Sequence, residues 1–174
     1  MPLSMYQASV PVFTQLLNAL SKNLEKAQAH TSARNLDPAA LLAFRLYPDM
    51  FPFTRQVQLA TDFARGCSAR LAGLEMPAYE NSETSFAELE DRIGRTVAFL
   101  GTLKAEQIDG SEDRECTFAA AGRTITLKGQ HYLMSFALPH VCFHCTTAYD
   151  MLRHNGVEVG KRDYLGAVPG LNLG

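Results

Sequence analysis

Four stretches of the chain repeat apolar residues at the three- and four-residue spacing of an amphipathic helix, and this pattern constrains the fold more than any other feature. The predicted helices cover residues 4–29, 51–71, 85–103 and 139–154. In the first, Pro11 either kinks the helix or marks its true start, because proline removes a hydrogen-bond donor and clashes with the preceding turn. Each apolar stripe has to be buried against the others, which predicts a four-helix bundle.

Shorter elements are expected between the long helices. Residues 37–44 begin with an Asp-Pro pair, which predicts an N-cap followed by a short helix. Residues 116–118 and 124–127 alternate across an Ala-Gly turn and predict a small β-hairpin, after which residues 130–136 form one or two helical turns. The predicted fold class is therefore mainly α, a four-helix bundle with a small β-hairpin inserted before the last long helix.

Length and composition favour one folded unit. The chain has 174 residues, which fits a single domain over residues 1–174, and we expect the tail at 157–174 to pack partly on the bundle and then fray. The net charge is −2 and basic residues are scattered, so a nucleic-acid partner is not expected. No apolar run is long enough for a membrane span, and the first residues do not read as a signal peptide, which predicts a cytoplasmic protein.

Two histidines on the last predicted helix form the chemical focus of the sequence. His140 and His144 are four residues apart, so they lie one turn apart on one face and can reach a common metal ion. Pro139 suits the first position of that helix. Gln56 projects into the apolar stripe of the second long helix and needs a buried partner, which the histidines supply if the two helices run parallel. Asp62 projects away from that stripe and is expected to be solvated or paired at the surface.

Several segments of the sequence also carry a family resemblance that extends over nearly the whole chain. They are Asp49-Met50-Phe51-Pro52, Gln56-Val57-Gln58, Arg70-Leu71-Ala72-Gly73, the run from Phe143 to Gly156, and Gly160-Lys161-Arg162-Asp163-Tyr164. With the H-x-x-x-H spacing on the last helix, they resemble the DinB/YfiT-like superfamily of four-helix-bundle proteins. The closer resemblance is to its uncharacterised branch, the domain of unknown function DUF1993.

The resemblance implies a metal site in the bundle core. In the metal-binding members of the superfamily, one histidine from the second helix joins two from the fourth, and His140 and His144 match the latter pair. Gln56 or Asp49 is then the third ligand or a group that orients the ligands. The implied cofactor is a divalent transition metal (zinc, nickel or manganese) with open positions for a water or a thiol, and a protein without a cofactor is an equal alternative.

Two classes of function therefore stay open. One is a metal-dependent enzyme with a small-molecule or thiol substrate bound near the fourth helix. The other is a noncatalytic homodimer that binds a small molecule or a protein, with the histidines in a metal-free polar core. Tyr149 and Arg153 either line a pocket or pair with Asp163 of the tail.

Cysteine chemistry is not expected to supply the function. Cys142 and Cys145 match the C-x-x-C pattern, but redox versions of that motif place the reactive cysteine at the very start of a helix. Here Cys142 falls about a turn inside the predicted helix. We therefore expect reduced, buried thiols.

Overall fold

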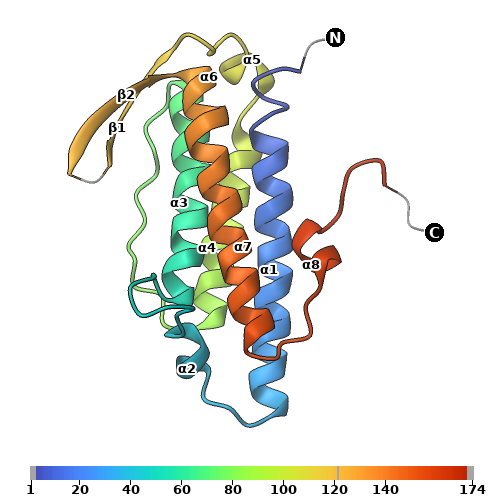
Figure 1. Ribbon diagram of the computed structural model, residues 1–174. Coiled ribbons are helices and arrows are strands. Elements are labelled where there is room, and N and C mark those ends of the chain that lie inside the picture. The colour runs from blue at the N-terminus through green and yellow to red at the C-terminus, as the bar shows by residue number, and fades with distance from the viewer. Residues whose placement is uncertain (1–2, 121, 172–174) are drawn as a thin grey trace.

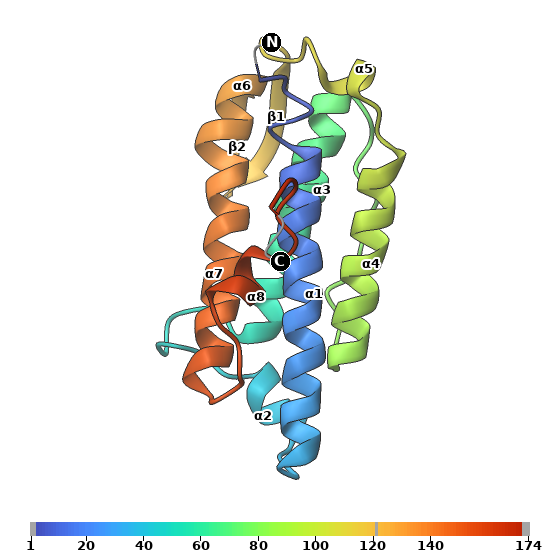
Figure 2. The same ribbon diagram turned by 90° about the vertical axis from the view of Figure 1, so that its right-hand side faces the viewer.

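The computed structural model describes residues 3–120 and 122–171 and confirms the mainly helical fold with a small hairpin before the last long helix. Its long helices are α1 (Val10–Ala33), α3 (Phe53–Ala72), α4 (Phe86–Thr102) and α7 (Leu138–His154). Both α1 and α3 pack against α4 and α7, and the four helices surround one apolar core (Figure 1, Figure 2).

The order of helix directions differs from a simple up-and-down bundle. In Figure 1 the chain ascends through both α3 and α4 and descends through α1 and α7, because the loop at residues 74–85 runs back along the bundle. Helices α3 and α7 are therefore adjacent and antiparallel, and the parallel arrangement assumed from the sequence is wrong. The antiparallel pair still brings Gln56 of α3 to His144 of α7.

Local signals in the sequence explain where several helices begin and end. Pro11 lies in the first turn of α1, so it marks the start of that helix rather than a kink. The hydroxyl of Ser85 accepts a hydrogen bond from the backbone N–H of Glu88 and caps α4. Helix α3 ends at Gly73, whose φ of 70° favours glycine.

The last long helix begins earlier than the sequence suggested. A short helix α6 (Gly129–His131) runs directly into a π-helical segment η1 (Tyr132–Ala137) and then into α7, so Pro139 lies inside a continuous helix. An interior proline would clash with a carbonyl of the preceding turn of a regular α-helix. The wider π turn relieves this clash, with the N–H of Leu138 bonded to the carbonyl of Leu133. Pro139 lies in the first turn of α7, as predicted, but that turn continues a helical run that begins at Gly129.

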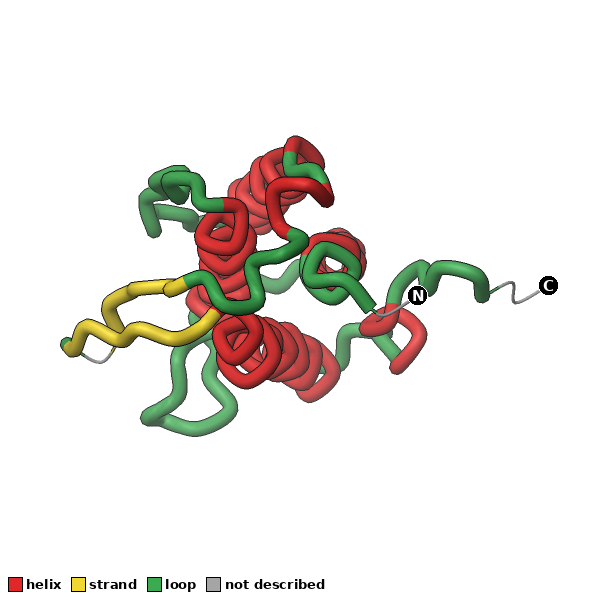
Figure 3. The backbone as a smooth tube through the Cα atoms, turned by 90° about the horizontal axis from the view of Figure 1, so that it is seen from above, coloured by secondary structure: helices red, strands yellow, loops and turns green. Residues whose placement is uncertain are grey.

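The hairpin pairs β1 (Glu115–Ala120) with β2 (Arg123–Lys128). The turn was predicted at Ala121 and Gly122, and Ala121 lies outside the described residues. Figure 3 shows it projecting to one side of the bundle, opposite the C-terminal tail. Arg70 of α3 attaches the hairpin, because its guanidinium donates to the hydroxyl of Tyr132 at 3.0 Å and to the carbonyl of Thr117 at 3.3 Å.

Two of the three remaining helices lie at connections and one in the tail. They are α2 (Pro38–Leu42), α5 (Ala105–Ile108) and α8 (Lys161–Leu165). Helix α8 packs on α1, where Lys26 pairs with Asp163 at 2.6 Å, and the end of the tail at 172–174, where fraying was expected, lies outside the described residues. Within the described part of the chain, no helix combines the length and apolar character needed to cross a membrane.

A network of charged side chains lies between α3 and α4 and includes Asp62. Its carboxylate pairs with Arg65 at 2.8 Å and with Arg92 at 2.6 Å, and these two arginines are 2% and 0% exposed. Asp62 itself is 26% exposed and paired, which agrees with its projection away from the apolar stripe. What the projection did not predict is that both of its partners are buried arginines, one of them on α4.

Candidate functional site

His140 is held in one orientation by its own helix and by aromatic rings. Its Nδ1 lies 2.7 Å from the carbonyl oxygen of Phe136, and because a carbonyl only accepts, Nδ1 carries the proton. The imidazole lies between the rings of Phe63 and Phe136, with centroid separations of 4.2 and 4.3 Å. The Nε2 lone pair is then the part of the ring left for another group.

His144 is held by α3 and is 6% exposed. Its Nδ1 lies 2.7 Å from Oε1 of Gln56, and Nε2 of Gln56 donates to the carbonyl of Phe51 at 3.1 Å. Gln56 thus has the buried partner that its position predicted. Burial, helped by the charges of His140 and Arg55, lowers the pKa of His144 to about 4, so this imidazole is neutral at physiological pH.

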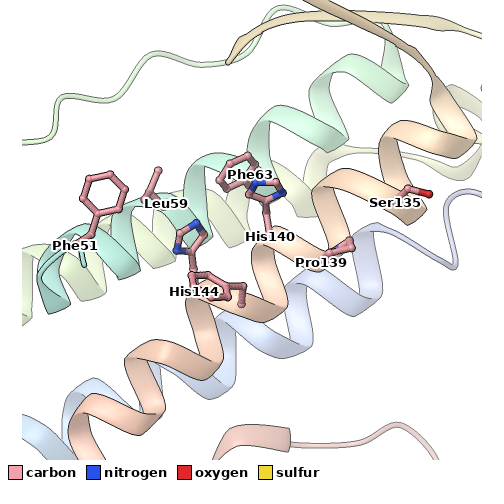
Figure 4. Close-up of a pocket in the computed structure, with 8 residues that line it drawn as sticks. Phe51, Leu59, Phe63, Ser135, Pro139, His140 and His144 are labelled. Carbon is pink, nitrogen blue, oxygen red and sulfur yellow. The ribbon is translucent and has the colours of Figure 1, made fainter. Parts of the chain in front are cut away.

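The two imidazoles are alike in two ways: each has an unbonded Nε2 atom, and each contacts the ring of Phe63. Within residues 3–120 and 122–171, the Nε2 atoms of His140 and His144 have no hydrogen-bond partner. Their ring centroids are 6.3 Å apart, and Phe63 of α3 contacts both rings, stacking on His144 at 5.6 Å. Figure 4 shows both imidazoles pointing from α7 toward α3. The α3 side chain that faces the pair is therefore an aromatic ring and not a metal ligand.

A pocket of about 570 Å³ opens between α3 and α7 at this point. Apart from the two histidines and Ser135, its walls are apolar. The lining residues are Phe51, Leu59, Phe63, Ser135, Pro139, His140, Phe143 and His144 (Figure 4). Such a cavity, with apolar walls and a few directed polar atoms, is typical of a small-molecule site.

The remaining residues singled out from the sequence lie elsewhere. Asp49 is exposed in the loop before α3 and does not line the pocket. Tyr149 packs on Tyr164 of the tail, and Arg153 donates to the carbonyl of Val159 at 2.9 Å. Both side chains hold the C-terminal segment. Asp163, the partner expected for them, pairs with Lys26 instead.

The cysteines of the C-x-x-C pattern are not activated. Burial raises the pKa of Cys145 to about 12, with a further contribution from Cys142, and burial also raises the pKa of Cys142. Thiols with raised pKa values are poor nucleophiles at neutral pH.

Sequence reasoning missed most of the pocket wall contributed by α3. Leu59 and Phe63 are four residues apart on one face of α3, beside the stripe assigned to the core, and Phe51 of the preceding loop joins them in the wall. Arg55 lies on the same face, one turn before Leu59. This four-residue spacing is visible in the sequence, but it does not distinguish a pocket wall from an ordinary half-buried helix face.

Comparison with known proteins gives a family and a fold relative. The family described as "Domain of unknown function (DUF1993)" matches residues 5–165. A crystal structure of a DinB family member protein from Shewanella denitrificans is similar to the chain at 37% identity and a TM-score of 0.85. The similarity covers 96% of this chain and 94% of that one. No curated protein matches the chain.

Proposed function

Because the chain belongs to the DUF1993 family and has the fold of a DinB family member, we propose that it is a DinB-like protein that binds a small molecule in the pocket between α3 and α7. The bound molecule has an apolar body and a hydrogen-bond donor that reaches the Nε2 of His144. The observation that carries the proposal is a pocket of about 570 Å³ into which two oriented imidazoles present unbonded Nε2 atoms.

The bonding of His144 supports a role in binding rather than in proton transfer. Because the Nδ1–H of His144 donates to Oε1 of Gln56, Nε2 is an acceptor, and the low pKa keeps it so at neutral pH. A general base works best when its pKa is near the working pH, so a group with a pKa of about 4 is a weak one. A neutral acceptor in an apolar pocket selects ligands that carry a donor and disfavours those that leave it unpaired.

The side chains at the pocket supply too few ligands for the metal that the family resemblance implies. A catalytic zinc-type centre uses three protein ligands, and the described residues contain no group of three His, Cys, Asp or Glu side chains able to hold a metal ion. Gln56 faces Nδ1 of His144, on the side of the ring away from the free Nε2. The residues therefore do not fit a three-ligand centre of that type.

One observation favours metal dependence as a second candidate function. Histidines that bind metal through Nε2 usually donate their Nδ1–H to a carbonyl or carboxylate, and both imidazoles here donate Nδ1–H to an oxygen acceptor. Zinc, nickel or manganese held by His140 and His144 alone would be bound weakly. Elemental analysis of untagged protein, with His144→Gln as the control, distinguishes stoichiometric metal from none.

The main proposal is tested with p-cresol, whose ring matches the apolar walls and whose hydroxyl is a donor. In a ¹H–¹⁵N NMR titration, we expect a Kd on the order of 1 mM. A change in the ¹⁵N shift of the His144 Nε2 should accompany binding. Toluene, which has no donor, should bind more weakly.

A pair of tryptophan variants provides the control for that titration. Leu59→Trp fills the pocket and should abolish p-cresol binding, whereas Leu74→Trp adds the same ring on an exposed residue of the 74–85 loop and should leave binding unchanged. Binding that survives Leu59→Trp, or no binding to the wild-type protein, contradicts the proposal.

Homodimer formation and a cytoplasmic location stay predictions. Phe51 and Phe143 at the pocket mouth are 54% and 55% exposed and offer apolar area to a second copy. Light scattering coupled to size-exclusion chromatography tests the dimer, with Phe143→Ser as the variant expected to shift the protein toward monomer.

A further inference from the structure

One cation of α3, Arg55, lies next to the pocket. It is one helical turn before Leu59, and Phe51 lies just before the start of the helix; Leu59 and Phe51 both line the pocket. The Cζ atom of Arg55 is 6.0 Å from the centroid of the Phe51 ring. Arg55 therefore lies beside the end of the pocket at which Figure 4 shows Phe51 and His144.

Arg55 has no charged partner in the described part of the chain. Ion pairs occupy other arginines, including Arg65 and Arg92 on the opposite side of α3, but none involves Arg55. Its Nη1 donates to Oε1 of Gln58 at 3.2 Å, an amide acceptor that leaves the charge uncompensated. A half-buried guanidinium with most of its donors available is suited to a planar carboxylate.

The start of α3 adds to the positive potential at this end of the pocket. The N-cap of this 20-residue helix is Pro52, whose side chain makes no capping hydrogen bond, and the first turn holds no acidic residue. The N-terminus of a helix carries a partial positive charge, so a basic residue there is unfavourable unless an anion lies nearby. His144, 6% exposed and with its Nε2 unbonded, faces the same space, and no carboxylate lines the pocket.

We propose that the pocket selects a small organic carboxylate, whose apolar body lies against Leu59 and Phe63 and whose carboxylate pairs with Arg55. This inference rests on the proposed binding function and names the class of ligand. A carboxylate at Arg55 would also lie within the first turn of α3, where no described side chain caps the helix and, of the first three N–H groups, only that of Phe53 is bonded, to the carbonyl of Phe44 at 2.9 Å. A hydrogen-bond donor on the ligand body is still needed for the Nε2 of His144.

The test compares 4-hydroxybenzoate with 4-hydroxybenzamide, which have the same ring and hydroxyl and differ in charge. Titrations of the full-length protein by NMR should give a Kd at least about tenfold lower for the benzoate, because charge-assisted hydrogen bonds are about twice as strong as neutral ones. In Arg55→Met the preference should fall to twofold or less through weaker binding of the benzoate. Binding of the benzamide should change little.

Two further variants separate local pairing from net charge. Arg123→Met on β2 removes the same charge far from the pocket and should keep the preference, and Arg55→Lys should keep part of it as a point charge. Equal binding of the two ligands to the wild type, or a preference that survives Arg55→Met, overturns the carboxylate inference and leaves the pocket proposal standing. If neither ligand binds, both proposals fail.

Discussion

Two groups of buried polar side chains flank α3, and they differ in what lies against the atoms that the protein leaves unbonded. On the α4 side, the guanidinium of Arg92 donates to Thr61, Asp62, Glu83 and the carbonyl of Glu80, at distances from 2.6 to 2.8 Å. These partners come from α3 and from the 74–85 loop, so one side chain of α4 joins three segments. We call Arg92 and these partners the closed network. The neighbouring Arg65 is less completely bonded, because its Nε and Nη1 are buried without a hydrogen-bond partner among the described residues, and its guanidinium lies over the Tyr79 ring, 3.6 Å from the centroid.

On the α7 side, each imidazole has one ring nitrogen bonded and the other free. His144 and His140 bond to Gln56 and to the Phe136 carbonyl through Nδ1, and both present Nε2 to a pocket of about 570 Å³. A ligand that donates to these nitrogens would complete their bonding. The two regions therefore differ in what lies against their unbonded atoms, which is a packed aromatic ring at Arg65 and an open pocket at the histidines.

The largest expected effect comes from breaking the closed network. Arg92→Met leaves the carboxylate of Glu83 without its buried cation and that of Asp62 with Arg65 alone, and it should lower the free energy of unfolding by about 3–5 kcal/mol. The matched change in the pocket, His144→Gln, should cost no more than about 1 kcal/mol because the amide can still donate to Gln56. Urea unfolding of both variants measures the difference. Similar losses for the two variants would contradict the distinction drawn between the regions.

The fold was predictable from the sequence because it depends on patterns within single segments. The apolar stripes gave the long helices, and the alternation around residues 116–127 gave the hairpin. The start of α7 was predictable to within one residue, but its continuity with η1 was not, because a proline at position 139 is read as a helix start and gives no sign of the π turn before it. The return path of the 74–85 loop, which decides the direction of α4, leaves no periodic signal.

The site was predictable only in part for a related reason. The spacing of His140 and His144 and the odd position of Gln56 are properties of single helices, and the structure brings Gln56 and His144 together. The role of Phe63 depends on which face of α3 packs against α7, and the pattern of a single helix does not determine that packing. Arg92 was missed as well, since its partners lie on two other segments.

A pH titration sharpens the comparison from the pocket side. The pKa of His144 is about 4 in the fold, against an ordinary value near 6.5, so between these values the unfolded chain binds more protons. His144 is neutral in both states above pH 6.5. Stability is therefore lost as the pH falls from about 6.5 to about 4, by about 2 kcal/mol once solvent screening at the open pocket is allowed for.

The control for that titration is His144→Gln, in which this part of the pH dependence should disappear. The measurement is the free energy of unfolding at pH 7 and at pH 4.5 for both proteins. Carboxylates such as Glu83 contribute equally to the two curves, so the difference between the curves reports His144 alone. Parallel curves would show that His144 is solvated rather than held in an apolar site.

The ability of the two unbonded Nε2 atoms to bind metal can be tested by adding a third metal-binding side chain on α3. Phe63 contacts both imidazoles, so Phe63→His places a third imidazole nitrogen where it can bind zinc with them. The zinc affinity should rise at least about tenfold, which is a gain of about 1.4 kcal/mol in binding free energy. Calorimetric titration of untagged protein measures it, and adding His144→Gln should remove the gain. If the wild type already binds zinc tightly and stoichiometrically, the metal-dependent alternative replaces the metal-free pocket.

The smallest effect concerns Gln58, the side chain that joins the two regions. It accepts from Arg55 beside the pocket at 3.2 Å and donates to Glu83 of the closed network at 2.8 Å. Gln58→Met keeps the length of the side chain and removes both hydrogen bonds, which should lower the free energy of unfolding by about 1 kcal/mol. Carboxylate affinity should fall about twofold, since Arg55 keeps its charge but loses one bond that orients it. A loss as large as that of Arg55→Met would mean that the closed network governs the pocket and that the two regions act as one.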